Sequence, residues 1–336
     1  MTTLKGAMRS YDAAVKRAER ESKRRAKEAV RRYKELEKLR EIENAKQAVY
    51  DWMNYINSIQ SIHKNCSEDI NWKAIIKYPK PTSPDRKAIN QDIATTKLKS
   101  FKPSFLNKLF NNTDKKIAKL KREIEEAKIK DDKIFQSEQR HYSEELNDWE
   151  ILNRLAVGVN EKNPAVYNDI LDYFDPFSDI SELGTSISFD FESNPIDISF
   201  KVNETKIIPD YELKQTSAGK LSKKKMAKGK FYEIYQDHVC SSLIRIAREA
   251  FAHLPIDLVR INAVSNILNG ATGFVEEQAI LSVIIPKETI CKLNLNLIDP
   301  SDSMMNFVHN MKFNKTKGFS VVSKATIGND LKIQTN

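Results

Sequence analysis

The chain has 336 residues, of which 40% are hydrophobic and 30% charged, and it contains only 9 glycines. This length and apolar content exclude a wholly disordered protein and predict at least one hydrophobic core, while the scarcity of glycine favours long helices over a loop-rich all-β fold. No run of 18 apolar residues occurs, so the sequence predicts a cytoplasmic protein without a membrane span.

The formal charge of +9 is concentrated at the N-terminus. Residues 1 to 40 hold 14 Lys or Arg against 6 Asp or Glu, so the rest of the chain is almost neutral. Such a basic arm attracts polyanions, and both nucleic acid and an anionic membrane fit it. The residues expected to bind nucleic acid, in the arm and in a second lysine-rich stretch, are Arg17, Arg20, Lys23, Arg24, Arg25, Lys27, Arg31, Arg32, Lys223, Lys224 and Lys225.

Residues 7 to 78 lack Gly and Pro, which predicts one long helix or two nearly continuous ones. Its second half carries apolar residues spaced 3-4-3-4-3, typical of a coiled coil or helical hairpin: Ile42, Ala45, Val49, Trp52, Ile56 and Ile59. Its first half lacks such a seam and has charges on all sides, so it is expected to project into solvent or onto a partner. A connection over 79–112 leads to a second helix, from about 114 to 157, which is expected to pair antiparallel with the first.

After residue 158 the pattern becomes that of an α/β domain. Its strands are expected at 186–192, 196–202, 206–214, 256–264 and 278–285, with an amphipathic helix over 231–253. The predicted fold class is α+β overall, with a long basic N-terminal helical hairpin or coiled coil followed by a C-terminal α/β domain with a mixed sheet. The predicted boundaries are 1–157 for the arm, 158–325 for the domain and 326–336 for a tail.

The second and third of these strands alternate between an apolar and a polar face. A turn of two or four residues between them would place Asp197 opposite Asp210, on the face that also holds Glu212 and Lys214. Three carboxylates and a lysine would then converge. Carboxylate oxygens suit a hard divalent cation, so the pattern predicts a possible metal site.

This pattern resembles the PD-(D/E)xK motif of restriction-endonuclease-like nucleases. The motif would consist of Pro195-Ile-Asp197, with one residue inserted, and Glu212-Leu-Lys214, and the order of elements over about 160–265 is similar to the core of that superfamily. The resemblance implies Asp197, Glu212 and Lys214 as catalytic residues, with the two acids as ligands of Mg²⁺. The expected convergence adds Asp210, so the predicted metal ligands are Asp197, Asp210 and Glu212. The alternative is an amphipathic hairpin whose wet face carries these side chains without chemistry.

The segment 236–251, together with Asp299-Pro-Ser-Asp302 and Lys315-Thr-Lys-Gly-Phe319, resembles an uncharacterised bacterial family, which implies a bacterial origin and no particular activity. His238 and Cys240 point in different directions on the expected helix and are not expected to form a catalytic dyad. GxxxxGK[ST], GxGxxG, HExxH, GxSxG and CxxC motifs are absent from the sequence, so the chemistries that they serve have no support.

Two functional classes remain open. The first is a nucleic-acid-associated bacterial protein, a subunit of an antiviral defence or genome-maintenance complex, which binds DNA and has a nuclease-like C-terminal domain that uses Mg²⁺. The alternative is a non-catalytic coiled-coil scaffold or adaptor that docks a partner protein. Other protein subunits are expected as partners, and the coiled coil could also make the protein a homo-oligomer.

Overall fold

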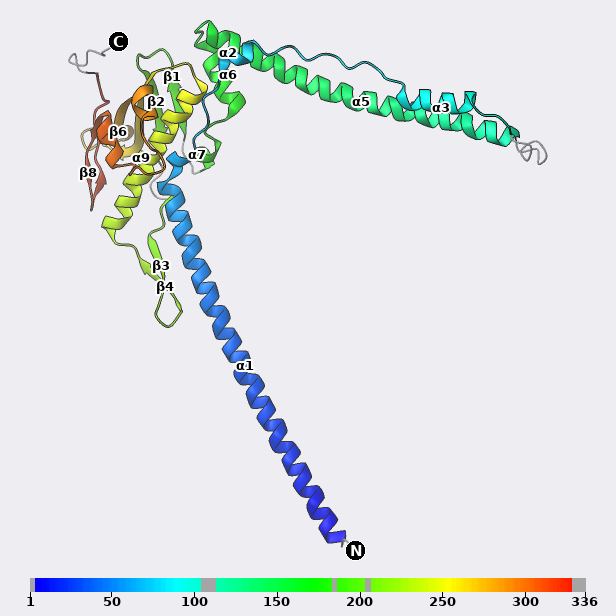
Figure 1. The fold of residues 1–336 in the computed structure, drawn as a ribbon. Coiled ribbons are helices and arrows are strands. Elements are labelled where there is room, and N and C mark those ends of the chain that lie inside the picture. The colour runs from blue at the N-terminus through cyan, green and yellow to red at the C-terminus, as the bar shows by residue number, and fades with distance from the viewer. Residues whose placement is uncertain (1–3, 104–112, 183–185, 203–206, 328–336) are drawn as a thin grey trace. The chain divides into compact units, whose positions relative to one another are not determined.

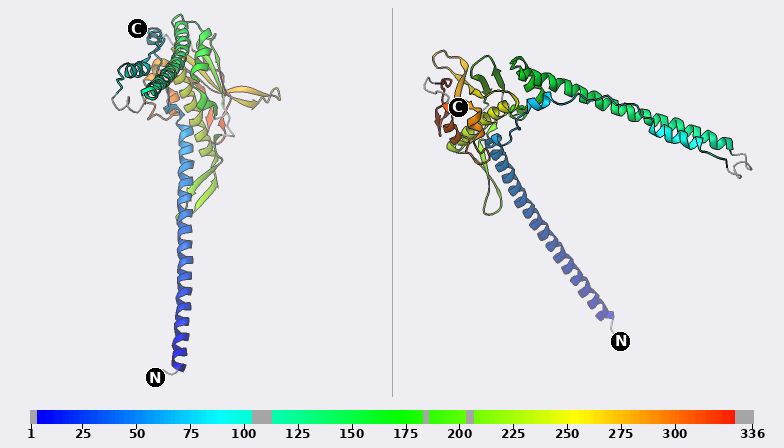
Figure 2. Two further views of the ribbon diagram at one scale, coloured as in Figure 1. Left: turned by 90° about the vertical axis from the view of Figure 1, so that its right-hand side faces the viewer. Right: turned by 45° about the horizontal axis from the view of Figure 1, so that its top comes forward.

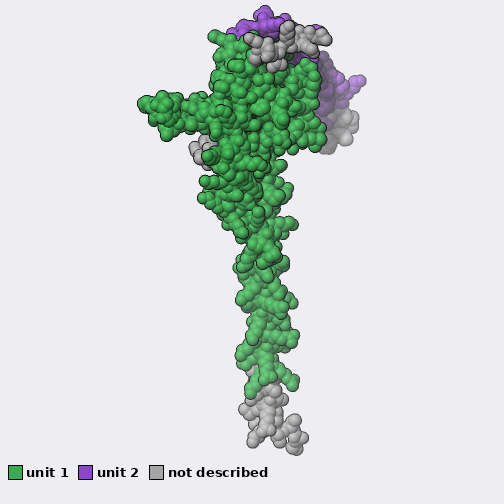
Figure 3. Space-filling view, turned by 90° about the vertical axis from the view of Figure 1, so that its left-hand side faces the viewer, with its two compact units in different colours: residues 1–68, 176–252, 256–336 green, residues 69–175, 253–255 purple. Residues whose placement is uncertain are grey.

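The computed structural model describes residues 4–103, 113–182, 186–202 and 207–327. The chain forms two compact units (Figure 3), which we call the sheet unit and the helical unit. The sheet unit consists of Met1–Glu68, Pro176–Ala252 and Ile256–Asn336, and the helical unit of Asp69–Asp175 and His253–Pro255. This division differs from the predicted boundary at residue 157, because the first long helix packs within the unit that contains the sheet.

Helix α1, Leu4–Gln60, is one continuous helix of 57 residues (Figure 1). Proline is absent from it, and its only glycine lies in the first turn, so nothing in its interior breaks it. The predicted apolar seam is buried, with Ala45, Ile56 and Ile59 each at most 8% exposed. The expected coverage of this seam by a second long helix is not found in the described part of the chain, where β3, β4 and α9 cover it instead.

The main sheet has five strands in the order β1-β2-β5-β6-β7. They are β1 (Ile187–Asp190), β2 (Ile196–Lys201), β5 (Leu258–Leu268), β6 (Val275–Pro286) and β7 (Val308–Met311). β2 and β5 are parallel, and the other neighbours are antiparallel, which confirms the predicted mixed sheet. Parallel neighbours need a crossover, and helix α9, Lys228–His253, supplies it along one face of the sheet (Figure 1).

A separate two-stranded sheet consists of β3 (Tyr211–Gln215) and β4 (Leu221–Lys225). The predicted pairing of 196–202 with 206–214 is therefore wrong. β2 lies between β1 and β5, and both of its edges are occupied. Consecutive burial of Ile207 and Ile208 breaks the alternation before β3, and β3 pairs with the lysine-rich stretch, which forms β4.

The remaining elements of the sheet unit are short. They are η1 (Ile62–Lys64), α7 (Ser178–Glu182), α10 (Lys287–Cys291), η2 (Asp302–Asn306), β8 (Phe313–Asn314) and β9 (Gly318–Phe319). β8 and β9 pair with each other.

The helical unit is built around α5, Thr113–Asn160, which packs with α2 (Trp72–Ile76), α3 (Ile89–Lys99) and α6 (Ala165–Phe174). The predicted partner of this helix was α1, but the two belong to different units. The contact with α3 is specific: the carboxylate of Asp131 accepts hydrogen bonds from the backbone N–H groups of Asn90 and Gln91 at 3.1 and 2.8 Å. It thereby satisfies donors in the first turn of α3, whose own N-cap, Ala88, has no side-chain oxygen.

Candidate nucleic-acid interface

The N-terminal part of α1 is exposed on every side. Each side chain from Lys16 to Glu41 is solvent-exposed, and α1 continues past the β3–β4 hairpin in both views of Figure 2. Residues 16 to 40 contain twelve Lys or Arg and five Glu, a surplus of seven positive charges. At 1.5 Å per residue, this charge is spread over ~36 Å of helix.

More than half of the twelve cations of this segment lie on one face. Seven of them follow each other at spacings of 4-3-4-4-3-4, and they form what we call the cation row: Lys16, Arg20, Lys23, Lys27, Arg31, Lys34 and Lys38. At 3.6 residues per turn, this spacing keeps all seven within a sector of about 80°. The five glutamates lie outside this sector, together with Arg17, Arg24, Arg25, Arg32 and Arg40. Charges therefore lie on all sides of the arm, as expected, but the sector of the row holds cations without carboxylates.

The cation row and the buried seam share one face of α1. From Lys38 the same spacing continues to Ile42, Ala45 and Val49, and then along the rest of the seam to Ile59. One face of a single helix is therefore cationic where it is exposed and apolar where it packs against β3, β4 and α9. This arrangement fixes the direction of the row, which points to the side of α1 where the β3–β4 hairpin lies.

Ion pairs along the exposed segment leave most of the row's charge uncompensated. The described pairs are Arg24–Glu28 at 3.2 Å, Arg25–Glu21 at 2.6 Å and Arg31–Glu35 at 3.0 Å. Of these cations, Arg31 belongs to the row. All three pairs are exposed, and each contributes less than about 1 kcal/mol.

The β3–β4 hairpin brings a second group of cations beside the end of the row. Its tip contacts α1, because Gln215 Nε2 donates to the carbonyl of Ile42 at 2.9 Å. Gly219 has φ +80°, and a Cβ there would lie 2.7 Å from the Ile42 side chain, so the close approach requires glycine. The predicted nucleic-acid-binding lysines of this stretch, Lys223, Lys224 and Lys225, are all exposed on β4.

Glu212, on β3, is surrounded by lysines. Lys214 Nζ and Lys230 Nζ each lie 3.1 Å from one of its carboxylate oxygens. The hydrogen bond from Lys214, followed by that from Lys230, lowers the pKa of the Glu212 carboxyl. The carboxylate is therefore ionised at neutral pH and held by two cations.

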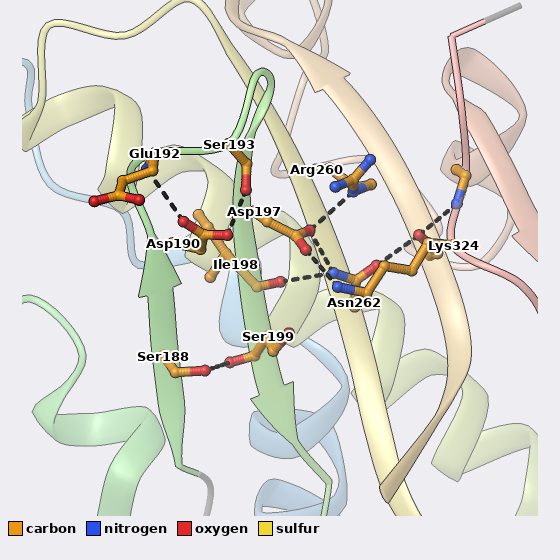
Figure 4. A network of polar contacts seen from close by, with 12 residues as sticks. Ser188, Asp190, Glu192, Ser193, Asp197, Ile198, Ser199, Arg260, Asn262 and Lys324 are labelled. Carbon is orange, nitrogen blue, oxygen red and sulfur yellow. Dashed lines mark hydrogen bonds and ion pairs between the residues drawn. The ribbon is translucent and has the colours of Figure 1, made fainter.

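Asp197, on β2, lies in a polar network on the five-stranded sheet (Figure 4). It is 7% exposed and accepts hydrogen bonds from Arg260 Nε at 2.9 Å, from Asn262 Nδ2 at 2.6 Å and from Lys324 Nζ. Burial would raise the pKa of Asp197, but the hydrogen bonds from Arg260, Lys324 and Asn262 outweigh it and hold the pKa below its ordinary value.

The network continues from Asn262 across the sheet. Ser282 Oγ donates to Asn262 Oδ1 at 2.7 Å, and the backbone N–H of Ala325 donates to Ser282 Oγ at 2.9 Å. Asn262 and Ser282 are both completely buried. The network therefore links β2, β5 and β6 to the segment that follows β9.

The predicted convergence of Asp197 with the residues of β3 is wrong, although the structure does bring Glu212 and Lys214 together. Asp197 belongs to the five-stranded sheet and Glu212 to the β3–β4 hairpin, so the assumed register does not exist. Asp210 is exposed just before β3. Within the described ranges, no group of three or more His, Cys, Asp or Glu side chains is arranged to hold a metal ion.

His238 and Cys240 of α9 are buried and occupy packing positions. His238 is 2% exposed, and its Nδ1 lies 3.1 Å from the carbonyl oxygen of Ile59. Cys240 is completely buried and Cys66 partly buried, whereas Cys291 is exposed. Burial raises the pKa of the Cys66 thiol to about 11.

Three members of the cation row, Lys16, Lys34 and Lys38, were missed as candidate binding residues. The signal that identifies them is the helical spacing of cations, which carries the same information as the spacing of apolar residues. Arg25 and Arg32, which were predicted to bind, lie on the other side of the helix.

Comparison with family models, with curated proteins and with solved structures finds no match to this chain. No helix in the described ranges is long and apolar enough to cross a membrane.

Proposed function

We propose that this protein binds duplex DNA through the cation row of α1. The observation that carries the proposal is a line of seven Lys and Arg residues on an exposed helix face that holds no carboxylate. The row is ~33 Å long, close to one turn of B-form DNA, which presents one phosphate charge per ~1.7 Å of axis. Binding of the row to phosphates would release counterions, and this release supplies the driving force.

The apolar residues of the arm favour DNA over a lipid surface. A helix that lies in a membrane interface needs an apolar face opposite its basic face. The large apolar side chains of the arm, Val30, Tyr33, Leu36 and Leu39, are 57 to 66% exposed and are spaced three residues apart. Each step of three residues turns by about 60°, so the four side chains spread over about 180° on the half of the helix away from the row. Charged side chains interrupt this half and prevent a continuous apolar face: Arg25, Arg32, Glu37 and Arg40.

The proposal contains no cleavage step. The carboxylates of Asp197 and Glu212 are each held by two cationic side chains, and they lie on separate sheets. These contacts support a role for both residues in structure. Sequence preference is also not part of the proposal, because contacts to phosphates carry no sequence information directly.

Two matched double variants test the proposal. The row variant, Arg20→Ala with Arg31→Ala, removes two charges of the row and the ion pair to Glu35. The control variant, Arg25→Ala with Arg32→Ala, removes two charges that lie outside the row and the ion pair to Glu21. Both variants lose the same charge and the same kind of ion pair, and both gain alanine at exposed helical positions. They therefore differ in which face loses charge.

The measurement is fluorescence anisotropy with a 20-bp duplex at several salt concentrations. The wild-type protein should show a steep fall of affinity with salt. The row variant should lower the slope of log K against log salt by about 1.8, since each phosphate contact contributes about 0.9, and the control should change it much less. Absence of salt-dependent binding by the wild-type protein would overturn the proposal, and equal effects of the two variants would show that the row is not the binding face.

A further inference from the structure

The turn between β8 and β9 displays two lysines that the proposed function has not used. Asn314 Oδ1 accepts hydrogen bonds from the backbone N–H groups of Thr316 at 2.9 Å and Lys317 at 3.2 Å, which fixes the turn. Lys315 and Lys317 are exposed on it. These residues belong to the segment Lys315-Thr-Lys-Gly-Phe319 noted in the sequence.

This turn packs against the first turns of α9. Gly318 has φ +77°, and a Cβ there would lie 2.7 Å from the ring of Tyr232, so glycine allows the close contact. The rings of Tyr235 and Phe319 lie 5.5 Å apart in an edge-to-face arrangement. The turn is therefore held firmly beside the start of α9.

Three separate segments thus place cations around the start of α9. We call them the lysine cluster: Lys223, Lys224 and Lys225 of β4, Lys228 at the beginning of α9, and Lys315 and Lys317 of the β8–β9 turn. The first turn of α9 contains no acidic residue, and the dipole of this 26-residue helix adds partial positive charge at the same end. The Glu212 carboxylate contacts this turn through Lys230, which is not counted in the cluster. The cluster therefore concentrates positive charge at this end of α9.

The lysine cluster also lies on the side of α1 to which the cation row points. Lys230 Nζ, in the first turn of α9, lies over the ring of Trp52 at 5.4 Å from its centroid. Trp52 belongs to the seam, and the seam and the row share one face. Along the axis of α1, Trp52 is ~21 Å beyond Lys38 and ~54 Å from Lys16.

We infer that the cation row and the lysine cluster bind the phosphate backbone of the same DNA duplex. At 3.4 Å per base pair the combined site covers about 16 base pairs, whereas the row alone covers about ten. This inference rests on the proposed binding of DNA by the row. It adds a second region of contact with the DNA backbone, in which Lys315 and Lys317 bind phosphates, and it defines the length of duplex that the protein covers.

The first test compares two double variants. The cluster variant carries Lys315→Ala and Lys317→Ala, and the control variant carries Lys64→Ala and Lys292→Ala. The control lysines are exposed and belong to the same unit. Lys64 follows His63, which contacts Ser241 of α9, and Lys292 follows Cys291, which contacts Arg248 of α9. Those contacts lie ~20 to 30 Å along α9 from Lys228. The control therefore removes the same charge at a distance from the cluster.

Binding to 10-bp and 20-bp duplexes is measured at several salt concentrations. The wild-type protein should show a steeper salt slope with the longer duplex. The cluster variant should lose about 1.8 from the slope with 20 bp, while the control keeps the wild-type slope. If the wild-type protein binds neither duplex, the proposed function fails; if it binds and the cluster variant behaves like the control, the extension fails while binding by the row stands.

An alanine inserted between Arg40 and Glu41 provides a second test that changes no charge. One extra residue turns the row by about 100° away from the cluster and leaves the seam in place. The variant should keep its affinity for the 10-bp duplex and lose the additional salt dependence seen with 20 bp. Retention of the full slope with 20 bp would overturn the inference that the two regions act on one duplex.

Discussion

Replacement of Asp197 by alanine should destabilise the protein much more than replacement of Glu212. Asp197 is the acceptor for Arg260, Lys324 and the completely buried amide of Asn262. Its removal takes away the short hydrogen bond of that amide and leaves it the longer one to the carbonyl of Ile198 at 3.4 Å, at a cost of about 1 to 3 kcal/mol. It also leaves the partly buried guanidinium of Arg260 without its carboxylate partner. Together these losses correspond to about 3 to 5 kcal/mol, the usual cost of breaking a buried charge pair.

Glu212 provides the comparison. Its two partners are exposed, since the side chains of Lys214 and Lys230 retain 70% and 42% of their accessible surface. Both ammonium groups can return to water when the carboxylate is removed, so Glu212→Ala should cost less than about 1 kcal/mol. The contrast between the two carboxylates arises from the burial of their donors, not from the number of ion pairs.

Urea unfolding at pH 7, followed by circular dichroism, measures both losses. Asp197→Asn serves as a third variant, because the amide keeps an oxygen acceptor for Asn262 and loses the charge, and its loss should be intermediate. The urea dependence of the unfolding free energy should remain unchanged in all three variants. Losses for Asp197→Ala and Glu212→Ala that agree within about 0.5 kcal/mol would refute the anchoring role of the network.

Two further predictions concern stability. Burial raises the pKa of Asp237 to about 6, so the folded state holds a proton that the unfolded state releases near pH 4, and stability falls as pH rises between these values. Asp237→Asn should therefore raise the unfolding free energy at pH 8 by about 1 to 2 kcal/mol, a value reduced for the partial exposure of the side chain. The same substitution should change the unfolding free energy little at pH 4, and equal effects at both pH values would contradict this reasoning. Gly219→Ala should lower the unfolding free energy measured in urea by about 1 to 2 kcal/mol, because of the positive φ at Gly219 and its contact with Ile42. Gly270→Ala, with no atom within 4 Å of the added Cβ, should leave it nearly unchanged. Equal losses in the two variants would count against a strained contact at Gly219.

The sequence predicts elements better than it predicts their partners. The absence of Gly and Pro and the 3-4 spacing from Ile42 to Ile59 correctly predict a long helix with a buried face. The helix ends at Gln60, however, and η1 and an irregular connection follow where the helix was expected to continue toward residue 78. Helical spacing, however, specifies only that a face is buried. Whether a long helix or a short β-hairpin covers that face depends on contacts between residues more than 150 positions apart, such as the hydrogen bond from Tyr55 to the carbonyl of Ile207.

The same limit applies to the strands. Alternation correctly predicts that Ile198 and Phe200 face a core, and both are at most 1% exposed. The partner strand is not encoded in that alternation, and the nearest strand in the sequence proved to be the wrong choice. Lysine is disfavoured in strands, so Lys223, Lys224 and Lys225 suggest a loop; they form β4 because β3 offers an antiparallel partner and α1 supports the hairpin.

The packing of the seam has a consequence for the exposed part of α1. Burial of Ala45, Ile56 and Ile59 fixes the rotation of α1 about its own axis within the sheet unit. Because the helix is continuous, that rotation is transmitted to every residue before the seam, and a cation at Lys38 or Lys27 has its direction set by apolar contacts ~10 to 30 Å away. The core of the sheet unit therefore orients the basic face of the arm, and the hydrophobic seam and the cation row are two parts of one structural feature.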